Sequence, residues 1–363
     1  MSPEARDSGA DDRAGPGDRV EDYDYPLPAE LIAQQRLGPR ADSRLMYMPS
    51  TGAPRHLAFR DLGSLLRPGD LLVVNDTRVI PARVRFEHLG REAEILLLHP
   101  AGGDADVWEC LVRPGRRMLP GMRMQVRFGL WADVLAPGAG GGKRLRFSPP
   151  GRLAQLLPEI GEMPLPPYIH EPLADPERYQ TVYAREPGSA AAPTAGLHFD
   201  EPMLAELAAA GVARAPVTLR IGLDTFQPLR VDSLSDHRMH SETYEIPPAT
   251  RQAIDTARAN GGRIVAVGTT VARALEAAAA KAGAGEPRER ADSGATDIFL
   301  RPGHRFREVD MLLTNFHLPR STLLVLVSAF AGRERILDAY RVAVAEGYRF
   351  YSFGDAMLLG PIR

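Results

Sequence analysis

Hydrophobic positions in the first half of the chain fall into short runs that Gly and Pro separate. These runs contain many β-branched residues, and a turn-forming Asn75-Asp76 pair stands between the first two. Several short strands at close spacing are typical of a small antiparallel β-barrel or sandwich. The runs occupy residues 71–74, 79–84, 93–98, 107–112, 124–128 and 145–147.

From residue 202 onward, the pattern changes to an alternation of helices and strands. This alternation predicts an α/β layer with a mainly parallel sheet. The predicted helices occupy residues 202–211, 247–260 and 272–282, and the predicted strands occupy residues 215–221 and 263–267.

The C-terminal part continues this pattern with one more strand and helix. An apolar strand ends at Thr314-Asn315-Phe316-His317, and Ser321 or Thr322 is then expected to cap a long apolar helix. Residues 348–357 predict an aromatic strand that closes with a Gly-Asp turn. The N-terminal region adds a short helical stretch over residues 29–35.

Composition narrows the possible chemistry. The net charge is −2, so any polyanionic partner must be bound by a local basic patch. Cys110 is the single cysteine, which excludes an intrachain disulfide, a Cys-rich zinc site and a Cys-ligated iron–sulfur cluster. No apolar run reaches transmembrane length, and residues 1–19 contain no apolar signal region. We therefore expect a cytoplasmic protein with a disordered N-terminal tail.

One stretch, residues 188–199, combines small side chains and two glycines with a single hydroxyl and a single imidazole. The loop either lines a pocket and offers Thr194 and His198 to a substrate, or forms a turn in which His198 is partly buried with a satisfied hydrogen bond. This stretch alone leaves both interpretations open.

Other polar groups are predicted at strand ends, where α/β sheets bind ligands. Thr269 and Thr270 follow Gly268 and precede a helix, so they either hold a polar ligand group or simply begin the helix. His317 ends a strand, and Asp355 stands in a turn. The segment 236–242 contains His237, His240 and Glu242, but no pattern for a third metal ligand is evident, and we expect no metal.

Basic residues gather in the small β region. Arg113, Arg116 and Arg117 lie close together, and Arg123 and Arg127 follow. They either bind an RNA backbone or form the solvated face of a half-buried sheet.

Six motifs, in this order over residues 23–359, resemble the S-adenosylmethionine:tRNA ribosyltransferase-isomerase family of queuosine biosynthesis. Each motif is weak alone, but the ordered set is specific. The motifs are Asp-Tyr-Pro-Leu-Pro at 24–28, Val-Asn-Asp-Thr-Arg-Val-Ile-Pro-Ala-Arg at 74–83, Ala-Pro-Thr-Ala-Gly-Leu-His-Phe at 192–199, Val-Gly-Thr-Thr at 267–270, Leu-Thr-Asn-Phe-His-Leu-Pro at 313–319 and Phe-Gly-Asp-Ala-Met at 353–357.

The resemblance implies an α/β main domain (21–65 and 150–363) with an inserted small antiparallel β-barrel domain (66–149), after a disordered tail (1–20). It also implies transfer and isomerisation of the ribosyl moiety of S-adenosylmethionine onto a 7-aminomethyl-7-deazaguanine wobble base of tRNA, with release of adenine and methionine. S-adenosylmethionine is then a co-substrate, no cofactor is bound permanently, and we expect a monomer.

Such a reaction needs a base at C5′, a proton donor for adenine and hydrogen bonds that hold the ribose. His198 and His317 are the first candidates for proton transfer and His240 the next, without an assignment of base and acid. The candidate substrate-binding residues are Asn75, Asp76, Arg78, Thr194, Thr269, Thr270, Asn315 and Asp355, and the candidate RNA-binding residues are Arg113, Arg116 and Arg117.

Four positions depart from the family pattern. Arg220 and Asp224 stand where the family typically has His and Gly, and Val271-Ala272 stands where it usually has Ser-Val. Arginine stays protonated and cannot act as a general base. Two alternatives therefore remain: a diverged paralogue that binds S-adenosylmethionine with another acceptor or none, and a non-catalytic RNA-binding protein.

Overall fold

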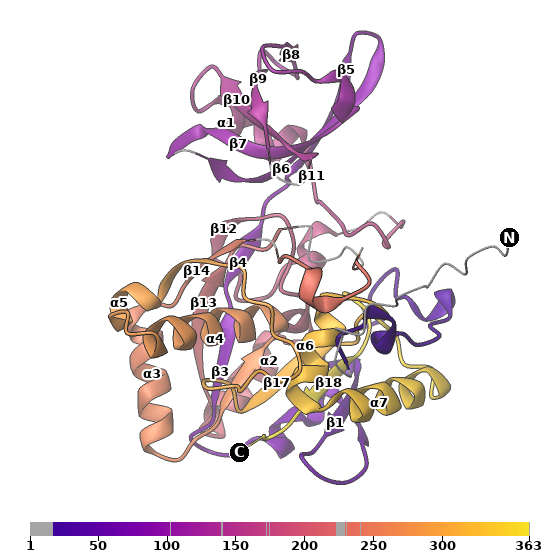
Figure 1. The fold of residues 1–363 in the computed structure, drawn as a ribbon, viewed down its shortest axis with the longest axis vertical. Coiled ribbons are helices and arrows are strands. Elements are labelled where there is room, and N and C mark those ends of the chain that lie inside the picture. The colour runs from indigo at the N-terminus through magenta and orange to yellow at the C-terminus, as the bar shows by residue number, and fades with distance from the viewer. Residues whose placement is uncertain are drawn as a thin grey trace, which may run out of the picture.

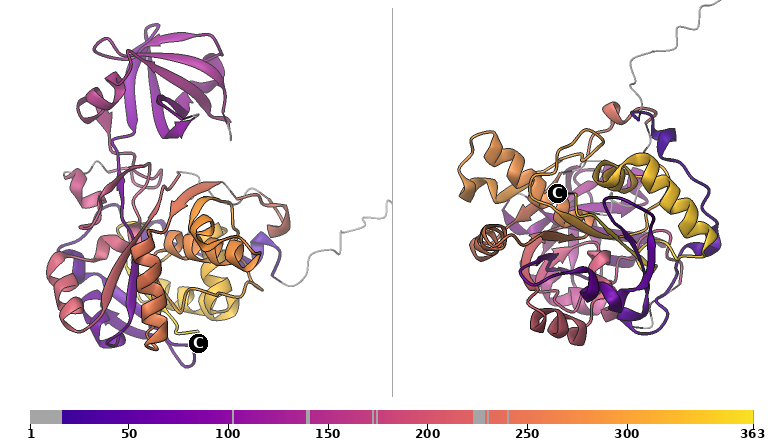
Figure 2. Two further views of the ribbon diagram at one scale, coloured as in Figure 1. Left: turned by 90° about the vertical axis from the view of Figure 1, so that its left-hand side faces the viewer. Right: turned by 90° about the horizontal axis from the view of Figure 1, so that it is seen from below.

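A computed structural model describes residues 17–101, 103–138, 141–171, 173, 175–222, 229, 231–239 and 241–362. Two sheets dominate the fold, and Figures 1 and 2 show the smaller one standing apart from the larger body of the molecule. The predicted disorder over residues 1–20 falls largely on residues outside the described ranges. Within 17–20, Val20 is buried and its amide donates to the Asp232 carbonyl.

The larger sheet is mixed and not mainly parallel as the sequence predicted. Neighbouring strands are parallel in the centre, from β13 to β17, and again between β18 and β1, whereas the other neighbours are antiparallel. Its nine strands are, in spatial order, β16 (Ser293–Thr296), β14 (Glu242–Glu245), β13 (Ala213–Leu219), β3 (Leu71–Asn75), β15 (Ile264–Val267), β17 (Met311–Asn315), β18 (Ala356–Leu359), β1 (Arg44–Met48) and β2 (Arg55–Ala58).

Helices cover both faces of this sheet. Leu71 and Val73 of β3 belong to one core with the helices α3, α4, α6 and α7, and Leu72 and Val74 belong to a second core with α2. A strand that is buried on both faces is apolar at every position, which explains this uninterrupted run. The helices are α2 (Glu201–Ala209), α3 (Pro248–Ala259), α4 (Thr269–Gly283), α5 (Arg288–Ala291), α6 (Thr322–Ala331) and α7 (Arg333–Ala345).

The smaller sheet is antiparallel and has its own hydrophobic core. Among the described residues, its edge strands β11 and β8 do not pair, so it is an open, curled sheet and not a closed barrel. Its strands are, in spatial order, β11 (Gly161–Glu162), β5 (Arg83–His88), β6 (Arg91–Ala101), β7 (Asp104–Arg113), β10 (Lys143–Ser148), β9 (Trp131–Pro137) and β8 (Arg123–Gln125), with helix α1 (Arg152–Ile160) before β11.

The limits of the curled sheet differ from the predicted range 66–149. Residues 71–75 pair in the larger sheet, and β4 (Thr77–Val79) pairs with β12 (Glu186–Ser189), so both were wrongly placed in the small unit. At the other end, α1 and β11 extend the curled sheet to Glu162, because β11 pairs with β5.

Most predicted helices and strands of the second half are confirmed, including the cap of α6, where Ser321 accepts from the Leu324 amide. Two local predictions were wrong. Residues 29–35 contain only the 3₁₀ turn η2 (Ala29–Leu31). The aromatic segment from residue 348 is irregular, and the strand β18 begins after the Gly-Asp turn, because the aromatic rings pack into the core around Tyr340.

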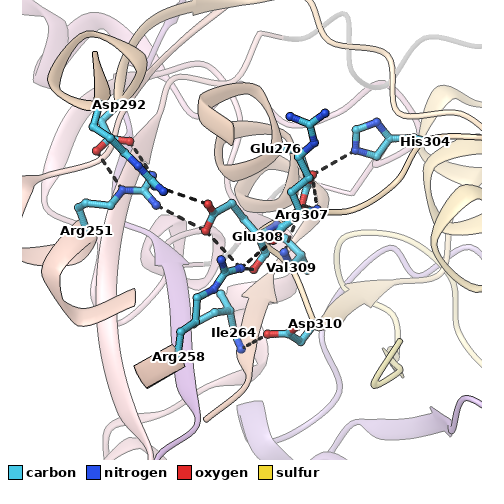
Figure 3. A network of polar contacts seen from close by, with 11 residues as sticks. Arg251, Arg258, Ile264, Glu276, Asp292, His304, Arg307, Glu308, Val309 and Asp310 are labelled. Carbon is cyan, nitrogen blue, oxygen red and sulfur yellow. Dashed lines mark hydrogen bonds and ion pairs between the residues drawn. The ribbon is translucent and has the colours of Figure 1, made fainter. Parts of the chain in front are cut away.

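A buried polar network fixes α4 relative to β15 and β17 (Figure 3). Glu276 of α4 accepts from the amides of Arg307, Glu308 and Val309 and contacts His304 Nε2 at 3.1 Å. Burial by itself would raise the pKa of the Glu276 carboxyl. The hydrogen bonds stabilise its charged form more strongly, so the net effect is a lowered pKa.

The same segment connects the two strands directly. Asp310, which precedes β17, accepts from the Ile264 amide of β15 at 2.8 Å. Glu308 also lies 3.5 Å from Arg251 and 3.3 Å from Arg258, both on α3. The middle of α4 and the starts of β15 and β17 are therefore joined by hydrogen bonds and ion pairs, in which Glu276 and Glu308 are buried.

Candidate active site

A small cavity lies at the carboxyl ends of β15 and β17. Its walls include residues 192–195, 268–270 and 314–318, together with Tyr168 and Tyr351. None of its lining residues in the described part of the chain is Asp, Glu, Lys or Arg. The cavity therefore lies where α/β sheets bind ligands, and it binds through neutral groups.

The loop that the sequence singled out forms one wall of this cavity. It turns through η8 (Thr194–His198), and a side chain at Gly196 would collide with the Tyr183 hydroxyl. The small residues in this stretch thus allow close packing against the protein itself. Thr194 lines the cavity and donates to Asn315 Oδ1 at 2.8 Å.

His317 lines the cavity, as its position at a strand end predicted. Its Nε2 lies 2.8 Å from Thr314 Oγ1, its amide donates to the Tyr340 hydroxyl, and its carbonyl accepts from the Tyr25 hydroxyl. Among the described residues, Nδ1 has no hydrogen-bond partner. Burial lowers the pKa of the imidazole to about 3, so the ring is neutral near pH 7.

His198 lies behind the cavity wall and does not line it. The ring is fully buried, stacks on Phe59 and has partners at both nitrogens: Asn315 Nδ2 lies 3.0 Å from Nε2 and Ser43 Oγ lies 2.6 Å from Nδ1. Burial, with a contribution from the Arg36 guanidinium, holds the pKa of His198 well below its usual value. The two candidate histidines are therefore in different positions: His317 faces the cavity, and His198 supports Asn315.

Thr269 and Thr270 both line the cavity at the first turn of α4. The Thr270 hydroxyl is buried and has no hydrogen-bond partner in the part of the chain that the structure describes.

Four candidate residues lie away from the cavity. Asn75 is fully buried and its amide bonds only to the backbone of Thr77 and Leu219, so it joins β3 to β13. Arg78 forms an ion pair with the exposed Glu177.

The two acidic candidates also have structural partners. Asp76 accepts from Thr218 Oγ1 at 2.7 Å and pairs with Arg185, and burial raises its pKa. Asp355 accepts from the amides of Arg44 and Arg349, and burial raises its pKa as well.

Arg113, Arg116 and Arg117 are exposed along a large groove on the curled sheet. Three further arginines and three glutamates line the same groove, which we call the basic groove. They are Arg85, Arg91, Arg127, Glu87, Glu92 and Glu94.

His240 and Asp224 lie outside the described residues. Arg220 does not line the cavity; its amide donates to the Thr243 carbonyl and its side chain lies beside Gly188. Within the described ranges, no group of three His, Cys, Asp or Glu side chains is arranged to hold a metal, and no helix is long and apolar enough to cross a membrane.

Sequence reasoning missed the two tyrosines of the cavity. Tyr168 and Tyr351 have ring centroids 4.1 Å apart and come from segments that lie far apart in the chain. No local pattern marks a residue whose partner is far away in the chain. The Tyr351 hydroxyl, like that of Thr270, is buried without a partner.

Parallel strands that end at a cavity with a neutral imidazole and unpaired hydroxyls define an α/β protein with the features of an enzyme. The family described as queuosine biosynthesis protein matches residues 20–359, and the chain belongs to this family. The resemblance stated from the six motifs is confirmed.

Several relatives are similar over almost the whole chain. A protein named S-adenosylmethionine:tRNA ribosyltransferase-isomerase from Moorella thermoacetica is 54% identical over 94% of this chain and 99% of its own length. One of the same name from Symbiobacterium thermophilum is 53% identical over the same shares. A crystal structure of a Thermotoga maritima S-adenosylmethionine tRNA ribosyltransferase is 37% identical, with a TM-score of 0.53 over 93% of this chain and 99% of that one.

Proposed function

We propose that the protein transfers and isomerises the ribosyl moiety of S-adenosylmethionine onto the 7-aminomethyl-7-deazaguanine wobble base of tRNA. The products are epoxyqueuosine-tRNA, adenine and methionine. The observation that carries this proposal is the identity of about half of all residues, over nearly full length, with relatives named for this activity. S-adenosylmethionine is the co-substrate.

The cavity suits the donor because its described lining residues include no lysine or arginine and include the aromatic residues Tyr168, Phe316 and Tyr351. A sulfonium cation is attracted to the faces of aromatic rings such as Tyr168 and Tyr351. Lysine or arginine in this position would repel it. The same neutral lining leaves the C5′ proton next to the sulfonium acidic, since no nearby carboxylate offsets the positive charge.

We assign His317 as the base that removes the C5′ proton. In the tautomer that this role requires, Nε2–H donates to Thr314 Oγ1 and the lone pair of Nδ1 faces the cavity. When Nδ1 accepts the proton, the hydrogen bond from Nε2–H remains and becomes charge-assisted. Before it accepts the C5′ proton the imidazole is neutral, with a pKa of about 3, so at that stage it carries no proton for adenine.

His198 has a supporting role in this proposal. It contacts Asn315, which in turn holds Thr194 at the cavity wall. His198 is therefore a positioning residue. The proposed contacts to substrate are made by Asn315, Thr194, Thr269 and Thr270.

The basic groove is proposed to bind the tRNA. Arg113, Arg116 and Arg117 are exposed, and no side chain of the three has a hydrogen bond or ion pair within the described residues, so their guanidinium groups are available to phosphates.

The test is an incubation of the protein with S-adenosylmethionine and a tRNA that carries the aminomethyl-deazaguanine. Mass spectrometry of the digested nucleosides should show the epoxycyclopentanediol product, with an equal amount of free adenine. Binding of S-adenosylmethionine without either product would overturn the proposal and favour the diverged paralogue. The position of Arg220 outside the cavity lining supports the active enzyme.

Three further proposals concern organisation. Residues 83–162 form a separate domain, because the curled sheet has its own core. The protein is a monomer and acts in the cytoplasm, where its tRNA substrate is found. Light scattering after gel filtration tests the monomer, and a mass of twice 39.6 kDa would contradict it.

A further inference from the structure

The first turn of α4 presents unpaired hydrogen-bond donors to the cavity. The helix begins at Thr269 directly after Gly268, which has a φ of 99° and carries no capping side chain. The first amides of a helix have no acceptor within the helix, and the helix dipole places partial positive charge there. No acidic residue occupies this turn.

Thr270 adds a second, independent observation at the same place. Its side chain is 7% exposed, and its hydroxyl is buried without a partner although it belongs to a cavity-lining residue. Two other hydroxyls of the lining are paired, Thr194 with Asn315 and Thr314 with His317, whereas the Tyr351 hydroxyl, like that of Thr270, has no partner among the described residues. Native proteins rarely leave a buried hydroxyl unpaired unless a ligand or water completes it.

We propose that the first turn of α4, with the Thr270 hydroxyl, binds the carboxylate of the methionyl moiety of S-adenosylmethionine. This inference rests on the proposed function, in which S-adenosylmethionine occupies the cavity. The carboxylate is the only anionic group of that ligand. Since the cavity has no lysine or arginine, the helix end is its electropositive part and determines where the carboxylate lies.

The orientation of the ligand follows from this contact. With the methionyl end at α4, the sulfonium and ribose lie against the remaining lining residues, which include His317 and the two tyrosines. The same helix end could attract a phosphate of the tRNA, because both are oxyanions. The experiment below separates these two sources.

The test compares binding of S-adenosylmethionine and of decarboxylated S-adenosylmethionine by calorimetry, without tRNA. We expect the wild-type protein to bind the decarboxylated ligand at least tenfold more weakly. Thr270→Val should weaken binding of S-adenosylmethionine about fivefold to tenfold and leave binding of the decarboxylated ligand unchanged, because a lost hydrogen bond to a charged group costs more than one to a neutral group. Thr270→Ser, which keeps the hydroxyl, should bind both ligands like the wild type.

The matched control is Thr256→Val, on an exposed position of α3, which should change neither dissociation constant. Equal binding of both ligands by the wild type, or an equal loss of both in Thr270→Val, would overturn the carboxylate assignment. Binding of tRNA to the wild type and to Thr270→Val is measured separately; if the variant bound both small ligands like the wild type and only tRNA more weakly, the oxyanion would be a phosphate and the assignment would also be wrong. Failure of the wild type to bind S-adenosylmethionine at all would instead overturn the proposed function.

Discussion

The cavity of the larger sheet and the basic groove of the curled sheet differ most in charge. The cavity is lined by neutral groups at the ends of parallel strands, and its candidate base is kept neutral by burial. The groove is open and contains six arginines and three glutamates. Burial changes the pKa of a few groups in the first region, whereas long-range attraction dominates in the second.

This difference suggests a division of labour. A desolvated, neutral site suits proton transfer next to a sulfonium, because each hydrogen bond there is strong. An exposed, cationic face suits a polyanion, whose binding depends on salt. Substitutions in the cavity should therefore change the rate, and substitutions in the groove should change the affinity for tRNA.

The largest effect is expected for His317→Gln. Glutamine can still contact Thr314 but cannot take a proton, so we expect adenine release to slow about 10³-fold, within the range for a lost general base. Dissociation constants for S-adenosylmethionine and tRNA should stay within twofold of the wild type. A variant with at least a third of the wild-type rate would show that His317 is not the base.

His198→Ala should mainly reduce stability. It removes a buried ring together with its contacts to Asn315 Nδ2 and Ser43 Oγ, which we expect to lower the free energy of unfolding by about 3 kcal/mol, as measured in urea. His198→Gln should recover part of the stability and slow adenine release about tenfold. Because a positioning residue does not titrate, the pH dependence of that rate should match the wild type; a changed pH profile would assign proton transfer to His198.

Particular elements show what the sequence could predict. The alternation of helices and strands located α2, α3, α4 and their neighbouring strands correctly, because a 3.6-residue period is a local property. The run 71–74 was misplaced because a short apolar run looks the same in a barrel as in a central strand. The run lacks an alternation of polar and apolar residues, and this could have indicated a central strand. In contrast, β5 of the curled sheet alternates between polar and apolar residues, as Arg83-Val84-Arg85-Phe86-Glu87.

The sequence could predict which loops form the site, but it could not predict which way their side chains point. The sequence identified the loops of His198, His317 and Thr270, because small residues and strand ends are local features. It could not determine that His198 faces Ser43, a residue 155 positions away, and not the cavity. The side to which a buried side chain points depends on packing between distant segments.

The groove has the next effect in size. The triple variant Arg113→Gln, Arg116→Gln and Arg117→Gln should raise the dissociation constant for tRNA about tenfold and reduce its salt dependence by about one power of concentration per lost phosphate contact. The rate at saturating tRNA should not change. Arg341→Gln, on an exposed position of α7, is the matched control and should leave both values unchanged. An unchanged salt dependence in the triple variant would place tRNA binding elsewhere.

The smallest effect concerns pH and again separates the two regions. The pKa of His317 is about 3 in the folded protein and about 6.5 when unfolded, so the unfolded state takes up a proton first as the pH falls. The stability that the neutral ring contributes is complete above pH 6.5 and is lost progressively between pH 6.5 and pH 3. Between pH 7 and pH 5.5, this linkage should lower the free energy of unfolding of the wild type by about 1 kcal/mol, a loss that His317→Gln should not show.

Urea unfolding of both proteins at the two pH values gives this difference directly. Asp76 and Asp355 have raised pKa values and contribute in the opposite direction, but they do so in both proteins, so the comparison cancels their contributions. His99→Gln, at an exposed position of the curled sheet, should keep the wild-type dependence. An equal loss in the wild type and in His317→Gln would mean that the ring is not held neutral by burial, and the contrast between a desolvated cavity and a solvated groove would then fail at its central residue.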